Sequence, residues 1–472
     1  MSFVSTHPAP APTVTACPTT PGGGSAASPL PGVVSAGYTV PTVGRGFVEY
    51  ANFDHAASTP AFTRVATAVE RATRNYSSVH RGQGWASRVT SAQYEAARAE
   101  VATFVGARAD DVVVFTRNTT DSFNLLARAV PTDAHVVVFS SEHHATLLPW
   151  PSRRTHRLPV PGSVRDAEVL LDDALVAIAT EARESSSRRR AAPPVLVVLT
   201  GASNVTGEFW PVKSLTAIAR RRGARVALDA AQLAPHRAID LADLDVDWLA
   251  FSGHKVHAPY GAGVLVGRSD WLDAASPYLA GGGATAEVTD RHTRWASGPA
   301  RHEAGSPNVL GAIALAAACA TIREQRAAIE RHEAWLGATL VAGLRAIEGV
   351  QTYSIFGEDA DRAPVVTFTV DGLDSHLAAA ALSAEHGIGV RAGKFCAHIL
   401  VDTLLEEAGE DGLDAAIRVS GGIATTAEHV DRLVAAVADL AAHGPRAEYT
   451  VVSGQGWVPV EDTRDLSDAL PW

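Results

Sequence analysis

The stretch Arg225-Val226-Ala227-Leu228-Asp229 is a short apolar run that ends in a carboxylate. A second run, residues 248–251, leads directly into Ser252-Gly253-His254-Lys255. Runs that are apolar at successive positions are typical of strands buried on both faces of a parallel sheet. Because ligands of such sheets bind outside the carboxyl ends of the strands, the residues that follow these runs are candidate site residues.

Further runs of the same kind continue the pattern along the chain. Residues 112–115, 135–139, 195–199 and 264–266 are predicted strands, and helical stretches at 119–128 and 215–222 lie between them. Short β-branched runs that alternate with helices predict an α/β fold, with a mostly parallel sheet covered on both faces.

The order of predicted helices and strands changes after Pro307. An Ala-rich helix is predicted over 309–324 and runs on through 326–346, followed by strands at 365–370, 389–391 and 418–420 and a last helix at 426–442. We therefore expect four parts. They are a flexible arm rich in Pro, Ala and Gly (1–44), a large α/β domain (45–308) whose first residues join the small domain, a small C-terminal α+β domain (309–443) and a tail (444–472).

Composition narrows the class of protein. The chain of 472 residues is 46% hydrophobic and 19% charged, which is typical of a globular protein, and its formal charge of −11 argues against broad binding to a nucleic-acid backbone. Apolar stretches fall short of the roughly 20 residues that span a membrane, and no signal peptide is recognised. Cys17, Cys319 and Cys396 form no CxxC pair. We expect a cytoplasmic protein without a structural zinc site.

Lysine is scarce, and this restricts the chemistry. The chain has Lys213, Lys255 and Lys394 and no others, so any reaction that needs a lysine amine has three candidates. Neither a P-loop nor a G-x-G-x-x-G opening a helix after a strand occurs. What remains is a set of polar clusters at strand ends.

Two of these clusters follow predicted strands in the first half of the chain. Thr119 and Thr120 open a helix, where free N–H groups favour a phosphate, although threonine also serves as a simple helix cap. His143 and His144 follow the strand at 135–139. They are candidates for a metal site, for stacking on a planar ligand, or for an ordinary polar loop.

The other two clusters follow the strands quoted first. Asp229, with Gln232 one turn later, is placed to hold a protonated heteroaromatic nitrogen or to cap a helix. Lys255, with Ser252 and His254 just before it, is a candidate Schiff-base nucleophile, the alternative being a lysine in a surface loop. Together the four clusters offer partners for a phosphate, a ring face, a ring nitrogen and an aldehyde. Pyridoxal phosphate is the cofactor with those features, and no metal site is predicted.

The chain resembles the class V aminotransferase superfamily and, within it, the SufS-like cysteine desulfurase and selenocysteine lyase group. The resemblance runs in order from about residue 48 to 440. The stretches that carry it are residues 52–60, 77–82, 116–120, 142–144 with 148–150, 203–207, 229 with 232, 252–255, 303–308 and 391–398. It implies a fold-type I pyridoxal-phosphate enzyme, with a sheet of the seven-stranded type in the large domain.

The resemblance also implies a role for each matching position. Lys255 would be the Schiff-base lysine and His143 would stack on the ring. The cofactor would further be held by Thr119, Thr120, Asn204, Asp229, Gln232, Ser252 and His254. The substrate would be held by Arg391, Arg418 and Asn204, and Cys396 would become a persulfide.

These roles imply removal of sulfur from L-cysteine to give alanine, with Lys255 moving the Cα proton and Cys396 taking the sulfur. One alternative is a C–S lyase, epimerase or aminotransferase of specialised metabolism that does not use Cys396. Another is a non-catalytic binding protein on the same fold. The chain departs from the group's pattern at Lys394-Phe395, where two histidines are usual, and at residues 421–425. Both departures lie on the substrate side.

Family resemblance further implies a homodimer in which residues 281–283 lie near the neighbour's site. A sulfur-acceptor protein is a plausible partner. No nucleic acid or membrane partner is expected.

Overall fold

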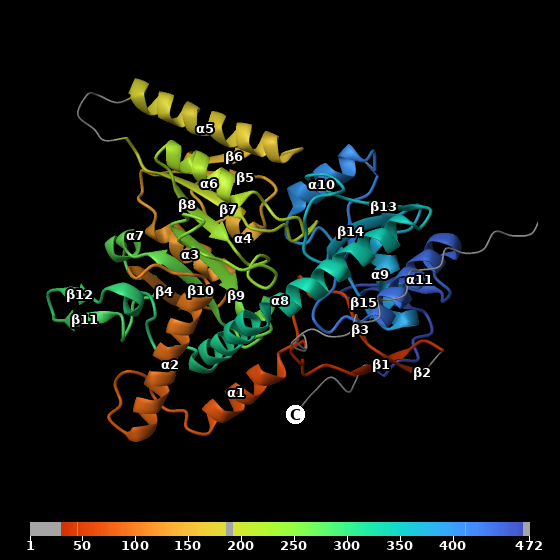
Figure 1. The fold of residues 1–472 in the computed structure, drawn as a ribbon, viewed down its shortest axis with the longest axis horizontal. Helices are drawn as coiled ribbons and strands as arrows, with labels where there is room; N and C mark the ends of the chain where they lie inside the picture. The colour runs from red at the N-terminus through yellow and green to blue at the C-terminus, as the bar shows by residue number, and fades with distance from the viewer. Residues whose placement is uncertain (1–29, 45, 186–191, 411, 466–472) are drawn as a thin grey trace, which may run out of the picture.

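In the computed structural model, which describes residues 30–44, 46–185, 192–410 and 412–465, the larger part of the molecule is built on a seven-stranded sheet (Figure 1). The strand order is β4 (Asp111–Thr116), β10 (Gly263–Arg268), β9 (Trp248–Ser252), β8 (Arg225–Asp229), β7 (Val195–Thr200), β5 (His135–Phe139) and β6 (Thr155–Leu158). The strands from β9 to β6 are parallel to one another. The predicted α/β fold with a mostly parallel sheet is confirmed.

Strand β10 runs against both of its neighbours. Only residues 253–262 separate it from β9, and a parallel return needs a crossover of a dozen or more residues, usually a helix. The short connection holds only the 3-10 turn η2 (Gly253–Lys255). It therefore turns the chain back on itself and keeps Lys255 at the end of β9.

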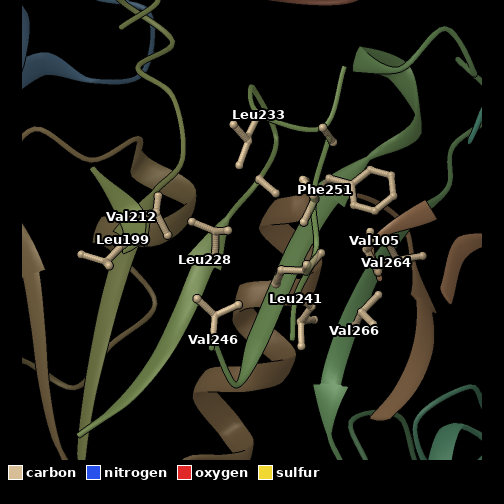
Figure 2. Close-up of a cluster of buried hydrophobic side chains, with 14 of the residues drawn as sticks. Val105, Leu199, Val212, Leu228, Leu233, Leu241, Val246, Phe251, Val264 and Val266 are labelled. Carbon is tan, nitrogen blue, oxygen red and sulfur yellow. The ribbon is translucent and has the colours of Figure 1, made fainter. Parts of the chain in front are cut away.

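Both faces of this sheet are buried. On β5, Val136 and Val138 pack into a core with α3 (Thr119–Ala129), whereas Val137 and Phe139 pack into a second core on the opposite face with α5 (Val164–Ser185). That second core takes Leu199, Leu228, Phe251 and Val264 from four adjacent strands (Figure 2).

The remaining helices of this part cover the sheet or pack beside it. They are α1 (Thr63–Thr73), α2 (Trp85–Phe104), α4 (His144–Leu147), α6 (Val212–Arg221) and α7 (Asp270–Ala274). The 3-10 turns η1 (Ser152–Arg154) and η3 (Gly298–Arg301) and the hairpin of β11 (Thr285–Val288) and β12 (Thr293–Trp295) lie in the connections.

A single helix, α8 (Val309–Arg345), joins the two parts of the molecule (Figure 1). Leu315 and Ile322 from its first half enter the core of the large sheet, and Leu336 and Leu340 from its second half enter a separate core. One continuous helix thus packs into both cores.

The second core belongs to a four-stranded sheet, ordered β13 (Val350–Thr352), β14 (Val365–Val370), β17 (Ala416–Ser420) and β16 (Arg391–Gly393). With it lie α9 (Ser375–His386), α10 (His398–Glu407) and α11 (Ala427–His443). The single strand predicted at 389–391 is wrong. The chain divides it into β15 (Ile388–Gly389), which pairs with β3 (Ala51–Asn52), and β16, which pairs with β17.

Part of the expected arm is ordered structure. Strand β1 (Thr39–Thr42) pairs with β2 (Gly46–Glu49), and Val33 is buried and bridges to Phe62. Residues 1–29, Cys17 among them, lie outside the described residues. The C-terminal segment forms a hairpin of β18 (Tyr449–Val452) and β19 (Gly456–Pro459), and residues 466–472 are likewise not described. Among the described residues, no helix is long and apolar enough to cross a membrane.

A buried carboxylate, Glu303, ties three segments of the large part together. Its Oε1 accepts hydrogen bonds from the backbone N–H of Phe115 (2.7 Å) and from Arg98 Nη1 (2.8 Å). Its Oε2 accepts from Tyr94 (2.9 Å) and from Arg98 Nη2 (2.9 Å). The connection before α8 is thereby fixed to α2 and β4.

Replacing Glu303 by alanine is expected to lower the free energy of unfolding by about 3–5 kcal/mol. The N–H of Phe115 and the hydroxyl of Tyr94 would lose their acceptor, and the largely buried Arg98 would keep only the exposed Glu95 as a carboxylate partner. Urea unfolding measures this change. Glu70→Ala is the control, since Glu70 and Arg74 form an exposed ion pair worth less than about 1 kcal/mol. Equal small effects of the two substitutions would contradict the structural role of Glu303.

Candidate active site

A cavity of about 320 Å³ opens where β7, β8 and β9 end, and residues of the four-stranded sheet close its other side. Its lining includes Thr200, Asp229 and Ser252, the last residues of those three strands. Every residue to which the family resemblance gave a role lines this one cavity: Thr119, Thr120, His143, Asn204, Asp229, Gln232, Ser252, His254, Lys255, Arg391, Cys396 and Arg418. His144, the other histidine of its cluster, does not line it.

One end of the cavity is formed by the N-terminus of α3. The helix is capped by Asn118, whose side chain accepts a hydrogen bond from the N–H of Asp121 (2.9 Å). The alternative in which a threonine caps this helix is therefore wrong. The N–H and hydroxyl of Thr119 instead lie 2.8 and 2.7 Å from Ser252 Oγ. Backbone N–H groups and hydroxyls gathered at a helix N-terminus favour an anion.

Lys255, in the η2 turn, and Asp229, at the end of β8, line the same cavity, and their charges interact. Burial lowers the pKa of Lys255 to about 8, although the charge of Asp229 acts in the opposite direction. Burial raises the pKa of Asp229, against the effects of Lys255 and of the N–H of Ala231, which donates to Asp229 Oδ1 at 2.8 Å. A lysine amine with a lowered pKa is a nucleophile near neutral pH.

The other two lysines lie in different surroundings. Lys213 pairs with Asp243 at 2.8 Å, and Lys394 pairs with Asp402 at 2.7 Å. Neither lysine lines the cavity. Lys255 is therefore the lysine whose position suits covalent chemistry in this cavity.

His143 is held neutral with a fixed ring orientation. It is the N-cap of α4, and its Nδ1 accepts a hydrogen bond from the N–H of Ala145 (3.0 Å). Burial, with the nearby charge of Lys255, lowers its pKa to about 3. Burial likewise lowers the pKa of His254 to about 4. Among the described residues, no group of three His, Cys, Asp or Glu side chains is arranged to hold a metal ion.

Two arginines enter from the four-stranded sheet. Arg418 is buried on β17, and its Nη1 donates to the carbonyl of Asn204 (2.9 Å). Burial lowers the pKa of Arg418 to about 10. Arg391, on the adjacent strand β16, is about half exposed.

Two acidic residues that contact the lining of the cavity were missed by the sequence analysis. Asp54 contacts both arginines, and it lies within the motif at 52–60 that could have indicated it. Glu142 is buried next to the two histidines, and its Oε1 accepts from the N–H of Thr200 (2.8 Å). Burial, with the nearby charge of Asp229, raises the pKa of Glu142 to about 8.

Cys396 lies in a strained loop at the mouth of the cavity. Cys396 is exposed. Cys319, by contrast, is buried in the core, and burial raises the pKa of its thiol. Phe395 and Cys396 have φ angles of 52° and 56°, in the left-handed region that non-glycine residues rarely occupy. The side chain of Asn204 donates to the carbonyl of Phe395 (2.8 Å), and the N–H of His144 donates to that of Cys396 (2.8 Å). These bonds hold the loop against the cavity.

The family model for class-V aminotransferases matches residues 51–433. The chain belongs to the class-V aminotransferase family. It is 33% identical over 398 residues to a protein of Synechococcus elongatus named cysteine desulfurase, an alignment that covers 82% of this chain and 59% of that protein. It is 32% identical to a probable cysteine desulfurase of Vibrio cholerae, over 76% of this chain and 85% of that protein.

A solved structure gives the same result for the fold. The apo structure of a cysteine desulfurase from Thermococcus onnurineus superposes with a TM-score of 0.71 at 31% identity, covering 84% of this chain and 95% of that one. The predicted resemblance, the fold class and the assignment to an enzyme of this family are confirmed.

The lowered pKa of Lys255 makes its reactivity dependent on pH. In cofactor-free protein, acetylation of Lys255 by acetic anhydride should rise with pH with a midpoint near pH 8, because only the neutral amine reacts. Peptide mass spectrometry measures the extent of modification at each pH.

Removing the negative charge in Asp229→Asn should move this curve to lower pH, because Asp229 favours the charged amine. Asp243→Asn, which alters the partner of Lys213, should leave it in place. A midpoint for Lys255 near its ordinary pKa of 10.5 would contradict the described surroundings.

Proposed function

We propose that the protein is a pyridoxal-phosphate-dependent cysteine desulfurase, which takes sulfur from L-cysteine and leaves L-alanine. One observation carries the proposal: a buried lysine, a buried carboxylate, two arginines and an exposed cysteine line the same cavity. The names of the relatives that cover most of the chain support it.

The residues of the cavity fit pyridoxal phosphate by their chemistry. Thr119, Thr120, Ser252 and the neutral His254 would hold the phosphate at the N-terminus of α3. Asp229 would pair with the ring nitrogen, and Lys255 would bind the aldehyde carbon.

The remaining cofactor contacts follow the same proposal. His143 would lie against the ring face. Gln232 would reach the ring hydroxyl, with Asn204 beside it. When bound, the cofactor supplies an electron sink for the bond that breaks at the substrate's Cα.

The rest of the proposed chemistry belongs to side chains of this chain. Arg418 and Arg391 would bind the substrate carboxylate, for which the planar guanidinium fork is suited. The amine of Lys255 would take the proton from the substrate's Cα and return a proton to the product. A pKa of about 8 keeps a useful fraction of this amine neutral near physiological pH.

Cys396 would accept the sulfur. Its thiolate attacks the sulfur of the substrate, so a sulfur–sulfur bond forms as the substrate's carbon–sulfur bond breaks. The substrate's carbon keeps the electron pair of the broken bond and takes up a proton. The products are therefore alanine and a Cys396 persulfide. Arg391, Arg418 and Lys255 line the same cavity as Cys396.

Further parts of the proposal concern the protein's surroundings. We propose a homodimer with residues 281–283 near the partner's site, a protein that accepts the persulfide sulfur, and a cytoplasmic location in which Cys396 stays reduced. The second candidate function, a carbon–sulfur lyase without a role for Cys396, is favoured by Lys394 and Phe395 standing where the group usually has histidines.

Cys396→Ala separates the two candidates. The proposal predicts that the variant keeps its bound cofactor and its visible absorption but forms alanine and sulfide from L-cysteine at least about 100-fold more slowly, because the sulfur has no acceptor. Amino-acid analysis and a sulfide assay measure the products. Cys319→Ala, which removes the buried thiol, is the control and should retain turnover. Unchanged turnover in Cys396→Ala would refute the persulfide route and favour the lyase.

A further inference from the structure

Asp54 is fixed by the backbone beside the strand that carries Arg418. The N–H of Ser420 donates to the carbonyl of Phe53 (2.7 Å), and the N–H of His55 donates to that of Ser420 (3.2 Å). Bonds on both sides of Asp54 therefore hold its main chain against the end of β17. Its side chain is about a quarter exposed.

The carboxylate of Asp54 contacts both arginines at once. Arg391 approaches it with Nη2 at 2.8 Å from Oδ2 and with Nε at 3.1 Å from Oδ1, which is a two-pronged contact. Arg418 adds a third contact, from Nη2 to Oδ1 at 3.1 Å. A single carboxylate thus bridges the two side chains expected to bind the substrate's carboxylate.

Asp54 accepts a hydrogen bond from only one of the two donors on the facing edge of Arg418. Nη2 and Nε form one edge of the guanidinium fork, and a carboxylate bound along this edge satisfies both nitrogens. Asp54 meets Nη2 alone, and among the described residues none accepts a hydrogen bond from the buried Nε. A buried charged donor without a partner is costly, so this edge is a place where a second carboxylate gains a hydrogen bond.

We propose that Asp54 occupies the carboxylate position on Arg418 until the amino acid binds, and then releases Arg418 while remaining paired with Arg391. The inference rests on the proposed function, since it takes an amino acid as the substrate. It makes Asp54 a specificity-determining residue. Two guanidinium groups and one carboxylate carry a net charge of +1, which matches a substrate with one carboxylate and disfavours one with two.

The test compares binding of two amino acids to the holoenzyme and to its Asp54→Asn variant. L-alanine carries one carboxylate and L-aspartate carries two, and isothermal titration calorimetry measures both without turnover. In Asp54→Asn the competitor for Arg418 is removed, so L-alanine should bind about threefold to tenfold more tightly. The preference for L-alanine over L-aspartate should fall by a similar factor, since the site then carries two net positive charges.

A purely structural role for Asp54 predicts the opposite sign. If the residue only positions the arginines, Asp54→Asn weakens the binding of L-alanine, and that result, or unchanged binding and preference, overturns the inference. Asp361→Asn is the matched control, because Asp361 also pairs with an arginine, Arg237, and this arginine does not line the cavity. It should bind both amino acids as the unsubstituted enzyme does.

The outcomes for the inference and for the proposed function are distinct. An enzyme that binds neither amino acid contradicts the proposed function itself. Should Asp54→Asn fail to fold, a crystal structure of the unsubstituted holoenzyme with L-alanine decides. The distance from Asp54 Oδ1 to Arg418 Nη2, 3.1 Å here, must then exceed hydrogen-bond length, and a retained contact overturns the inference.

Discussion

The interaction between Asp229 and Lys255 is the constraint on which the rest of the site depends. Both side chains are buried, and burial disfavours the charged form of each. The charge of each residue favours the charged form of the other. The geometry of the sheet brings the two residues into one cavity, because β8 and β9 are parallel neighbours whose carboxyl ends lie at the same edge. The short η2 turn then holds the amine just beyond that edge instead of leading into a crossover helix.

The opposite wall of the cavity comes from the second sheet, which adds cations. Helix α8 packs into both cores, and β3 from the N-terminal segment pairs with β15 near the strands that carry the arginines. Ala56 and Ala57, which follow β3, thereby join a wall that is otherwise built from residues beyond 390. The pairing of β3 with β15 places Asp54 against Arg391 and Arg418.

The fold was predictable from sequence where the signal was local. Runs such as 195–199 and 226–228 are apolar at every position, which identifies a doubly buried strand without any knowledge of its neighbours. The direction of β10 was not predictable from its own residues, because the length of the preceding connection decides it. The division of 389–391 into two strands was missed for a related reason: Gly389 and Arg391 pair with different partners, Asn52 and Arg418.

The residues of the site likewise divide into those that local sequence identifies and those that depend on distant contacts. Residues at strand ends, such as Asp229 and Lys255, were found because the strand itself marks the place. Asp54 and Glu142 were missed because their importance comes from contacts with residues distant in sequence. The central claim, that the amine of Lys255 is the cofactor's covalent partner, is tested most directly by reducing the holoenzyme with borohydride and mapping the phosphopyridoxyl group by peptide mass spectrometry. The account predicts the group on Lys255 and its absence from Lys213 and Lys394; a label on either of those two, or on none of the three, would contradict it.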